Sequence, residues 1–98
     1  MEEILWYTLA SSRGGDSRAR ILRSVADRPR NPNQLADALD LDYTTVRHHL
    51  DVLEENNVLK PAAEEYGAVY LPTDQVRANW TTVEEILDTV EPDEGWEE

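Results

Sequence analysis

The sequence of 98 residues contains no cysteine, only one lysine and no long apolar run. Without cysteine the chain can form neither disulfides nor thiolate metal sites, and this composition fits a reducing cytoplasm. No apolar stretch approaches the roughly 20 residues of a membrane-spanning helix, and no signal-peptide core is visible. We therefore expect a soluble cytoplasmic protein that does not enter the membrane.

Sequence patterns typical of catalysis are also missing. The chain has no nucleophile elbow, no glycine-rich phosphate loop and no carboxylate–histidine pair at a recognisable spacing. The adjacent His48 and His49 do not fit a metal site, because neighbouring helical residues point about 100° apart and helical ligand pairs prefer i, i+4 spacing. We expect no enzymatic activity, no cofactor and no bound metal, and we expect His49 to be a half-buried histidine with its polar atoms satisfied.

Charge is distributed unevenly along the chain, whose formal net charge is −12. Residues 13–50 contain seven arginines and five aspartates, whereas residues 51–98 contain fourteen acidic residues and only two basic ones. An acidic chain nearly free of lysine resembles proteins adapted to molar salt, where the Debye length is only about 3 Å and distant acids barely repel a phosphate. The alternative is an ordinary acidic protein that avoids nucleic acid.

The segment NPNQLADALDLDYTTVRHHLDVLEENNVL predicts two amphipathic helices separated by a three-residue turn. Asn31 can cap the first helix, with Pro32 at its first position and Gln34 placed for a capping box. In the turn, Asp40 tolerates a left-handed backbone and Asp42 can cap the second helix. This spacing is typical of a helix-turn-helix.

The flanking segments predict further helices. One covers residues 2–11 and ends before Gly14-Gly15, which permit a sharp turn. A second is capped by Asp16 or Ser17 and runs to about residue 26. The last begins after a cap at position 73 or 74 and runs to about residue 90, with a break near residue 80 where a second capping box is possible.

A hairpin is predicted between the helix-turn-helix and the final helix. Its strands cover residues 58–61 and 66–71, and Pro72 is expected to end the second strand. An Asn at 56 or 57 is expected to end the preceding helix in a left-handed conformation. We divide the chain into one domain over residues 1–91 and an acidic, disordered tail over residues 92–98.

The run DYTTVRHHLDVLEENNVL, with Leu35-Ala36, Leu39, Leu41 and the strand pair that follows, resembles the winged helix-turn-helix of ArsR-like transcriptional regulators, in particular the small regulators of halophilic archaea. The likeness extends from about Ile4 to Val90. Two departures matter: metal sensors of that family use cysteines, which are absent here, and the wing tip is Glu64-Glu65 where basic residues are common. The resemblance implies a mainly α fold with a small β-hairpin wing.

The polar face of the second helix, about residues 43–56, is the expected DNA-reading surface. Arginine can pair bidentately with guanine, and threonine can bond a base or pack on a thymine methyl. The resemblance also places this face against DNA, while the start of the preceding helix and the arginines before it are expected to contact phosphates. The predicted DNA-binding residues are Tyr43, Thr44, Thr45, Arg47, His48, Asn33, Gln34, Arg28 and Arg30.

Apolar residues at both ends of the domain predict a homodimer. The final helix has an apolar stripe with alternating four- and three-residue spacing, as in a helical pair, and the first helix adds a second set. The predicted dimerisation residues are Leu5, Trp6, Leu9, Val76, Trp80, Val83, Leu87 and Val90. The alternative is that the stripe packs on the chain's own core.

These features together predict a transcriptional regulator that binds double-stranded DNA as a homodimer. A protein-interaction module that reuses the fold without binding DNA is the alternative, and the acidic pair Glu64-Glu65 favours it because carboxylates would repel phosphates. No sequence feature identifies a small-molecule effector.

Overall fold

The computed structural model describes residues 2–11, 14–62 and 69–90 and shows a mainly helical fold with a two-stranded antiparallel hairpin. The elements, in chain order, are α1 (Glu2–Trp6), η1, a π-helix (Tyr7–Ser11), α2 (Gly15–Asp27), α3 (Pro32–Leu39), α4 (Tyr43–Glu55), β1 (Leu59–Pro61), β2 (Tyr70–Pro72), α5 (Asp74–Ala78) and α6 (Trp80–Val90). The predicted winged helix-turn-helix fold is confirmed. The wing tip Glu64-Glu65 and the tail over residues 92–98 lie outside the described residues.

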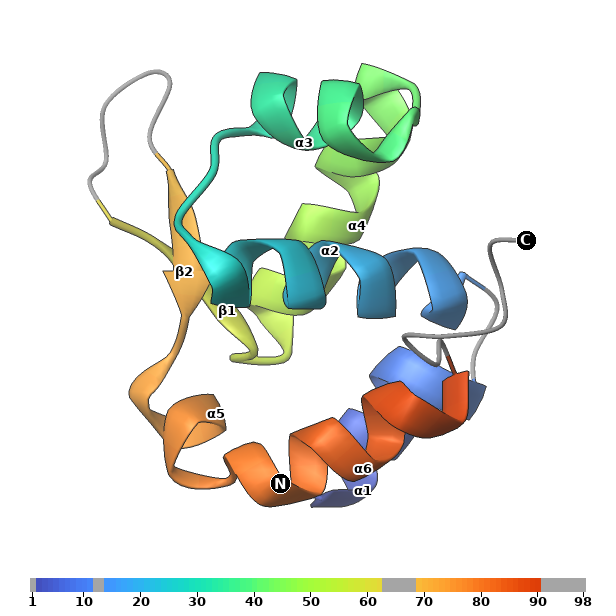
Figure 1. The fold of residues 1–98 in the computed structure, drawn as a ribbon, viewed down its shortest axis with the longest axis vertical. Helices are drawn as coiled ribbons and strands as arrows, with labels where there is room; N and C mark the ends of the chain where they lie inside the picture. The colour runs from blue at the N-terminus through green and yellow to red at the C-terminus, as the bar shows by residue number, and fades with distance from the viewer. Residues whose placement is uncertain (1, 12–13, 63–68, 91–98) are drawn as a thin grey trace.

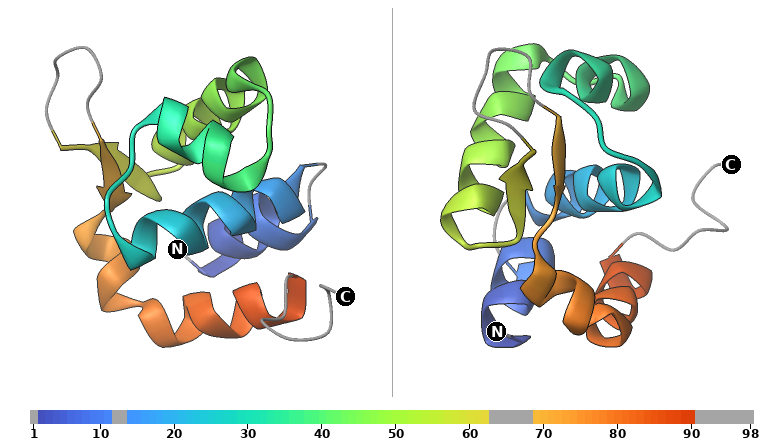
Figure 2. Two further views of the ribbon diagram at one scale, coloured as in Figure 1. Left: turned by 45° about the horizontal axis from the view of Figure 1, so that its top comes forward. Right: turned by 90° about the vertical axis from the view of Figure 1, so that its left-hand side faces the viewer.

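Helix α2 runs through the middle of the molecule (Figure 1). Helices α3 and α4 lie on one side of it, α1 and α6 lie together on the other, and the hairpin closes one end (Figures 1 and 2). Every described helix, including the short α5 through Val76, contributes buried residues to one shared interior. Its fully buried large side chains are Leu5, Leu9, Ile21, Leu22, Val25, Leu35, Val46, Leu50, Leu53, Leu59, Ile86 and Leu87.

The caps of the helix-turn-helix form as the sequence predicts. The Asn31 side chain accepts a bond from the Gln34 backbone N–H at 2.8 Å, and the Gln34 side chain accepts one from the Asn31 N–H at 2.9 Å. Asp40 ends α3 in the left-handed region at φ 57°, and Asp42 accepts a bond from the Thr44 N–H at 3.1 Å. These bonds satisfy helix-end groups that would otherwise lack partners.

The turn before α2 needs both of its glycines. Gly14 has φ 86°, and a Cβ there would lie 2.8 Å from Cε1 of His49. A Cβ on Gly15 would lie 2.9 Å from the Leu9 carbonyl. The predicted cap at Asp16 or Ser17 is wrong, because α2 already begins at Gly15, with Gly14 as N-cap and no side-chain bond. The Asp16 carboxylate instead accepts a bond from the N–H of Ser17.

The hairpin pairs Leu59 with Pro72, Lys60 with Leu71 and Pro61 with Tyr70. Pro72 was expected to lie beyond the strand, but it is the last residue of β2, since a proline at a strand end needs to donate no ladder bond. The N–H of Tyr70 also donates to the carbonyl of Arg30 at 2.8 Å, so the segment before α3 pairs with β2. The hairpin is thereby joined to the helix-turn-helix.

The C-terminal helix is divided as the sequence predicts, although the break lies at Asn79 between α5 and α6 and not at a second capping box. Thr73 is the N-cap of α5 and accepts a bond from the Val76 N–H at 3.2 Å. The Thr73 hydroxyl donates to the carbonyl of Asn57, which has φ 62° just after α4. The end of α4 and the start of α5 are therefore joined.

The eight predicted dimerisation residues do not share one environment. Trp6 is 36% exposed, and two residues of α6 are half-buried. Five are already covered within a single chain, because η1 and α6 pack on α2, α1 packs on η1 and α6, and α5 packs on α6. The half-buried pair is Trp80 and Val90. The five covered residues are Leu5, Leu9, Val76, Val83 and Leu87.

None of the helices in the described part of the chain is long and apolar enough to span a membrane.

Candidate nucleic-acid interface

Helix α4 has one buried face and one open face. Val46, His49, Leu50 and Leu53 recur at helical spacing and are buried against the rest of the domain. The open face at its N-terminal half contains the predicted base-reading residues. Of these, Tyr43, Thr44 and His48 are exposed, while Thr45 and Arg47 are partly exposed. The buried face thus fixes the direction in which these polar groups point.

Arg47 is held by two neighbours. Its Nη1 donates to the hydroxyl of Tyr70 at 3.4 Å, and its Nη2 lies 3.7 Å from a carboxylate oxygen of Asp51, one turn further along α4. A guanidinium has five N–H donors, so these contacts leave donors for a further partner. Arg47 therefore meets the chemical requirement for bidentate recognition of a base edge.

The structure adds Tyr70 to the residues around this face, a residue that the sequence identified only as part of a strand. Its ring belongs to the core and its exposed fraction is 6%, yet its hydroxyl reaches Arg47 of α4. The two residues are 23 positions apart. Because no periodicity or spacing signals such a contact, the sequence alone could not have predicted it.

His49 lies behind the open face, against α2. Its Nδ1 lies 3.2 Å from Nη1 of Arg18, and both side chains are buried. Arginine can only donate, so Nδ1 of His49 must be the acceptor and the proton of the neutral ring must be on Nε2. Burial, together with the positive charges of Arg18 and His48, lowers the pKa of His49 below its ordinary value. The predicted satisfied histidine is confirmed, with deeper burial than expected.

The histidine pair offers no metal site. The ring centroids of His48 and His49 are 5.4 Å apart and the rings are tilted by 56°, with one ring exposed and the other buried. Within the described ranges, no group of three His, Asp or Glu side chains is placed to hold a metal ion.

The start of α3 presents Asn33 and Gln34, which are both exposed. The Gln34 side chain is engaged in the capping box through its carbonyl oxygen. Asn33 occupies the first turn of the helix, where backbone N–H groups favour an anion. Both residues are accessible to a phosphate that approaches this end of α3.

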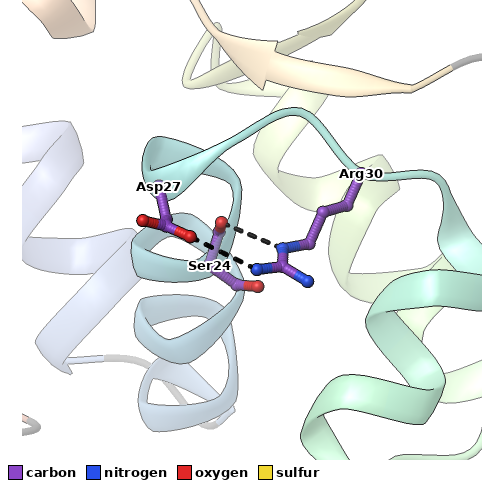
Figure 3. A network of polar contacts seen from close by, with 3 residues as sticks. All are labelled: Ser24, Asp27 and Arg30. Atoms are coloured by element: carbon purple, nitrogen blue, oxygen red, sulfur yellow. Dashed lines mark hydrogen bonds and ion pairs between the residues drawn. The ribbon is translucent and has the colours of Figure 1, made fainter.

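The two arginines before α3 differ in their surroundings. Arg28 is exposed, in an extended conformation at the end of α2. Arg30 is turned back onto α2, where its Nε donates to the carbonyl of Ser24 at 3.2 Å and its Nη2 lies 3.5 Å from the Asp27 carboxylate (Figure 3). In this conformation Arg30 caps the end of α2, so Arg28 is the better candidate for a phosphate contact.

Other arginines form hydrogen bonds or ion pairs within the fold. Arg18 donates to the Thr8 carbonyl in η1 at 2.8 Å, and Arg20 donates to the Leu39 carbonyl at the end of α3 at 2.9 Å. Arg23 pairs with Asp88 of α6 at 3.6 Å. The planar guanidinium supplies several directed donors, which a lysine ammonium does not. Much of the positive charge in residues 13–50 is therefore engaged in contacts that stabilise the fold.

Comparisons with known proteins agree with this geometry. A family model described as a helix-turn-helix domain matches residues 16–62. One similar solved structure is the homodimeric winged helix-turn-helix DNA-binding domain of a possible ArsR-family transcriptional regulator from Mycobacterium bovis. It is 18% identical to this chain, with a TM-score of 0.68, over 98% of this chain and 85% of that one. No curated protein sequence matches the chain. The comparisons support the winged helix-turn-helix fold.

Proposed function

We propose that this protein is a cytoplasmic transcriptional regulator that binds specific double-stranded DNA as a homodimer, with α4 in the major groove. The observation that carries the proposal is the open face of α4. Its polar residues project from a helix whose opposite side is fixed in the core, and a major groove admits a helix of this kind. The helix-turn-helix family match supports the same assignment.

Within this proposal the residues have separate tasks. Thr44, Arg47 and His48 contact base edges, with Tyr43 and Thr45 at the margin of the groove. Contacts to base edges distinguish one sequence from another. The phosphate contacts come from Arg28 and from the start of α3, residues 33–34, and they set orientation without reading sequence.

The dimer is proposed on α1 and η1, using surface that one chain leaves open. Ile4 and Tyr7 are 44% and 62% exposed and lie one turn apart, with Trp6 beside them at 36%. Exposed apolar groups that adjoin one another are typical of contact surfaces. The similar protein from Mycobacterium bovis is homodimeric. A two-fold axis would place two copies of α4 on successive half-sites.

Selection from random duplex DNA tests the main proposal directly. We expect the wild-type protein in molar potassium chloride to enrich one two-fold symmetric sequence, and Arg47→Ala to lose preference at one base pair in each half. Asp37→Ala, which changes an exposed residue of α3, serves as the control and should enrich the wild-type sequence. Enrichment of no sequence by the wild type over a range of salt concentrations would contradict the proposal.

A protein-interaction module remains the second candidate because of the net charge of −12. The exposed carboxylates of Glu84, Glu85 and Asp88 lie on α6 and suit a basic partner. If the selection returns no DNA while the folded protein binds a basic polypeptide, the second candidate is favoured. Titration of DNA and of a basic polypeptide against the same protein distinguishes the two.

A further inference from the structure

We propose that Tyr70 is a positioning residue that orients Arg47 for base recognition. Strand β2 of the wing then determines the direction of a base-reading side chain on α4. The inference rests on the proposed DNA-binding function and goes beyond it, because Tyr70 need not touch DNA. It starts from the bond between Nη1 of Arg47 and the Tyr70 hydroxyl, which joins the two elements at 3.4 Å.

Tyr70 is fixed from three directions. Its N–H donates to the Arg30 carbonyl at 2.8 Å, its backbone pairs with Pro61 across the hairpin, and its ring is packed in the core. With only 6% of the residue exposed, the ring has little freedom to turn. The hydroxyl therefore presents an acceptor at a constant position beside α4.

Arg47, in contrast, has a long side chain that is partly exposed. Its other contact, to Asp51, is a solvent-exposed ion pair at 3.7 Å between side chains that are 40% and 58% exposed, and such pairs hold a side chain weakly. Among the described residues, the bond to Tyr70 is therefore the contact that joins Arg47 to a rigid part of the fold.

Ordering the guanidinium before DNA arrives reduces the rotamer freedom that binding must remove. One N–H on Nη1 is used by Tyr70, and the remaining donors keep the fork geometry that matches guanine. Because Tyr70 also pairs with the segment at Arg30, a displacement of the wing relative to α3 would alter the direction of Arg47. The wing then affects specificity without reading any base.

The test combines Tyr70→Phe with Arg47→Ala in a double-mutant cycle on the full chain. Tyr70→Phe removes only the hydroxyl and keeps the packed ring. We expect it to weaken binding to the selected DNA by about three- to tenfold and to relax preference at the same base pair as Arg47→Ala. In the Arg47→Ala background the same change should have no effect on affinity. Thr81→Val, which removes a hydroxyl from an exposed residue of α6, is the matched control and should bind as the wild type does.

A second measurement needs no DNA. The NMR signal of the Arg47 side-chain Nε–H should shift and exchange faster with solvent in Tyr70→Phe and remain unchanged in Thr81→Val. The inference is overturned if this signal is unaffected, or if Tyr70→Phe lowers affinity for all sequences equally or by the same factor with and without Arg47. If the wild type selects no sequence, the proposed function fails by itself, and the NMR signal still decides whether Tyr70 positions Arg47.

Discussion

Nη1 of Arg18 lies 3.2 Å from Nδ1 of His49 in the interior, and this contact joins α2 to the buried side of α4. The same arginine donates through Nε to the Thr8 carbonyl of η1 at 2.8 Å. One guanidinium therefore connects the N-terminal helix, the central helix and the helix proposed to enter DNA. A buried polar network of this kind stabilises a fold only when each of its polar groups has a hydrogen-bond partner.

Protonation of His49 should destabilise the fold. The groups that face it are Arg18 and His48, which repel a proton, and Asp16, which attracts one. Burial and the two cationic neighbours lower its pKa in the folded state, whereas the unfolded chain keeps a value of about 6.5. Below about pH 6.5 the unfolded state binds the proton more readily, so the stability contributed by neutral His49 is present above that pH and is lost as pH falls toward the folded-state pKa.

Chemical denaturation at about pH 7.5 and about pH 5 measures this effect. The wild type should lose more stability between these values than His49→Asn, whose side chain keeps an acceptor near the Nδ1 position and does not titrate. Comparing the two variants cancels the contribution of the carboxylates. Equal losses in both proteins would show that His49 contributes nothing to the pH dependence.

Gly14→Ala should destabilise the domain by about 1–3 kcal/mol. Gly14 has φ 86°, and the added Cβ would lie 2.8 Å from His49 Cε1 and 3.1 Å from Arg18 Nη1. Both the backbone and the Arg18–His49 pair would have to move. Thermal unfolding compared with Asp37→Ala, a change on the exposed side of α3, measures the cost. A melting temperature equal to that of the wild type would show that position 14 does not require glycine.

Arg47→Ala and Arg28→Ala should affect DNA binding in different ways. Loss of Arg47 should cost about 1–3 kcal/mol on the selected sequence and remove the preference at one base pair. Loss of Arg28 should weaken all sequences alike and lower the salt dependence by about one phosphate contact. Fluorescence anisotropy with matched and mismatched duplexes distinguishes these outcomes. If Arg47→Ala binds the selected sequence with unchanged affinity, α4 is not the helix that reads the bases.

Molar salt should stabilise the fold and preserve specific binding. The net charge of −12 produces self-repulsion and repels DNA at low ionic strength, and both effects are screened as salt rises. Circular dichroism and anisotropy from about 0.1 to about 3 M potassium chloride should show stability and specific affinity that persist or improve. A steep, continuous loss of affinity with unchanged folding would contradict the expectation that the protein is adapted to high salt.

Tyr7→Asp should convert the dimer to a monomer that remains folded. Tyr7 is 62% exposed, so the charge can be solvated in the separated chain but not in an apolar contact. Tyr43→Asp alters another exposed tyrosine, on α4, and should remain dimeric. Leu87→Asp would not be informative, because Leu87 is fully buried in its own chain and the charge would unfold the domain. Sedimentation at concentrations on the order of tens of micromolar decides, and a monomeric wild type would end the dimer proposal.

The sequence predicted the helix-turn-helix closely because its signals act over short distances. The bonds of Asn31 with Gln34 and of Asp42 with Thr44 join residues two or three positions apart, so residue type and spacing almost specify them. The left-handed Asp40 and Asn57 follow from the tolerance of those side chains for positive φ. Amphipathic spacing similarly identified the buried side of α4.

Only the tertiary structure decided how distant residues combine. Arg47 meets Tyr70 across 23 positions and Arg18 meets His49 across 31, and no local pattern encodes either contact. An apolar stripe in the sequence likewise does not identify the surface that packs against it. The packing of α1 on η1 and α6, and of α6 on α2, covers Leu5 and Leu87 within one chain, because burial depends on which surfaces meet once the chain has folded.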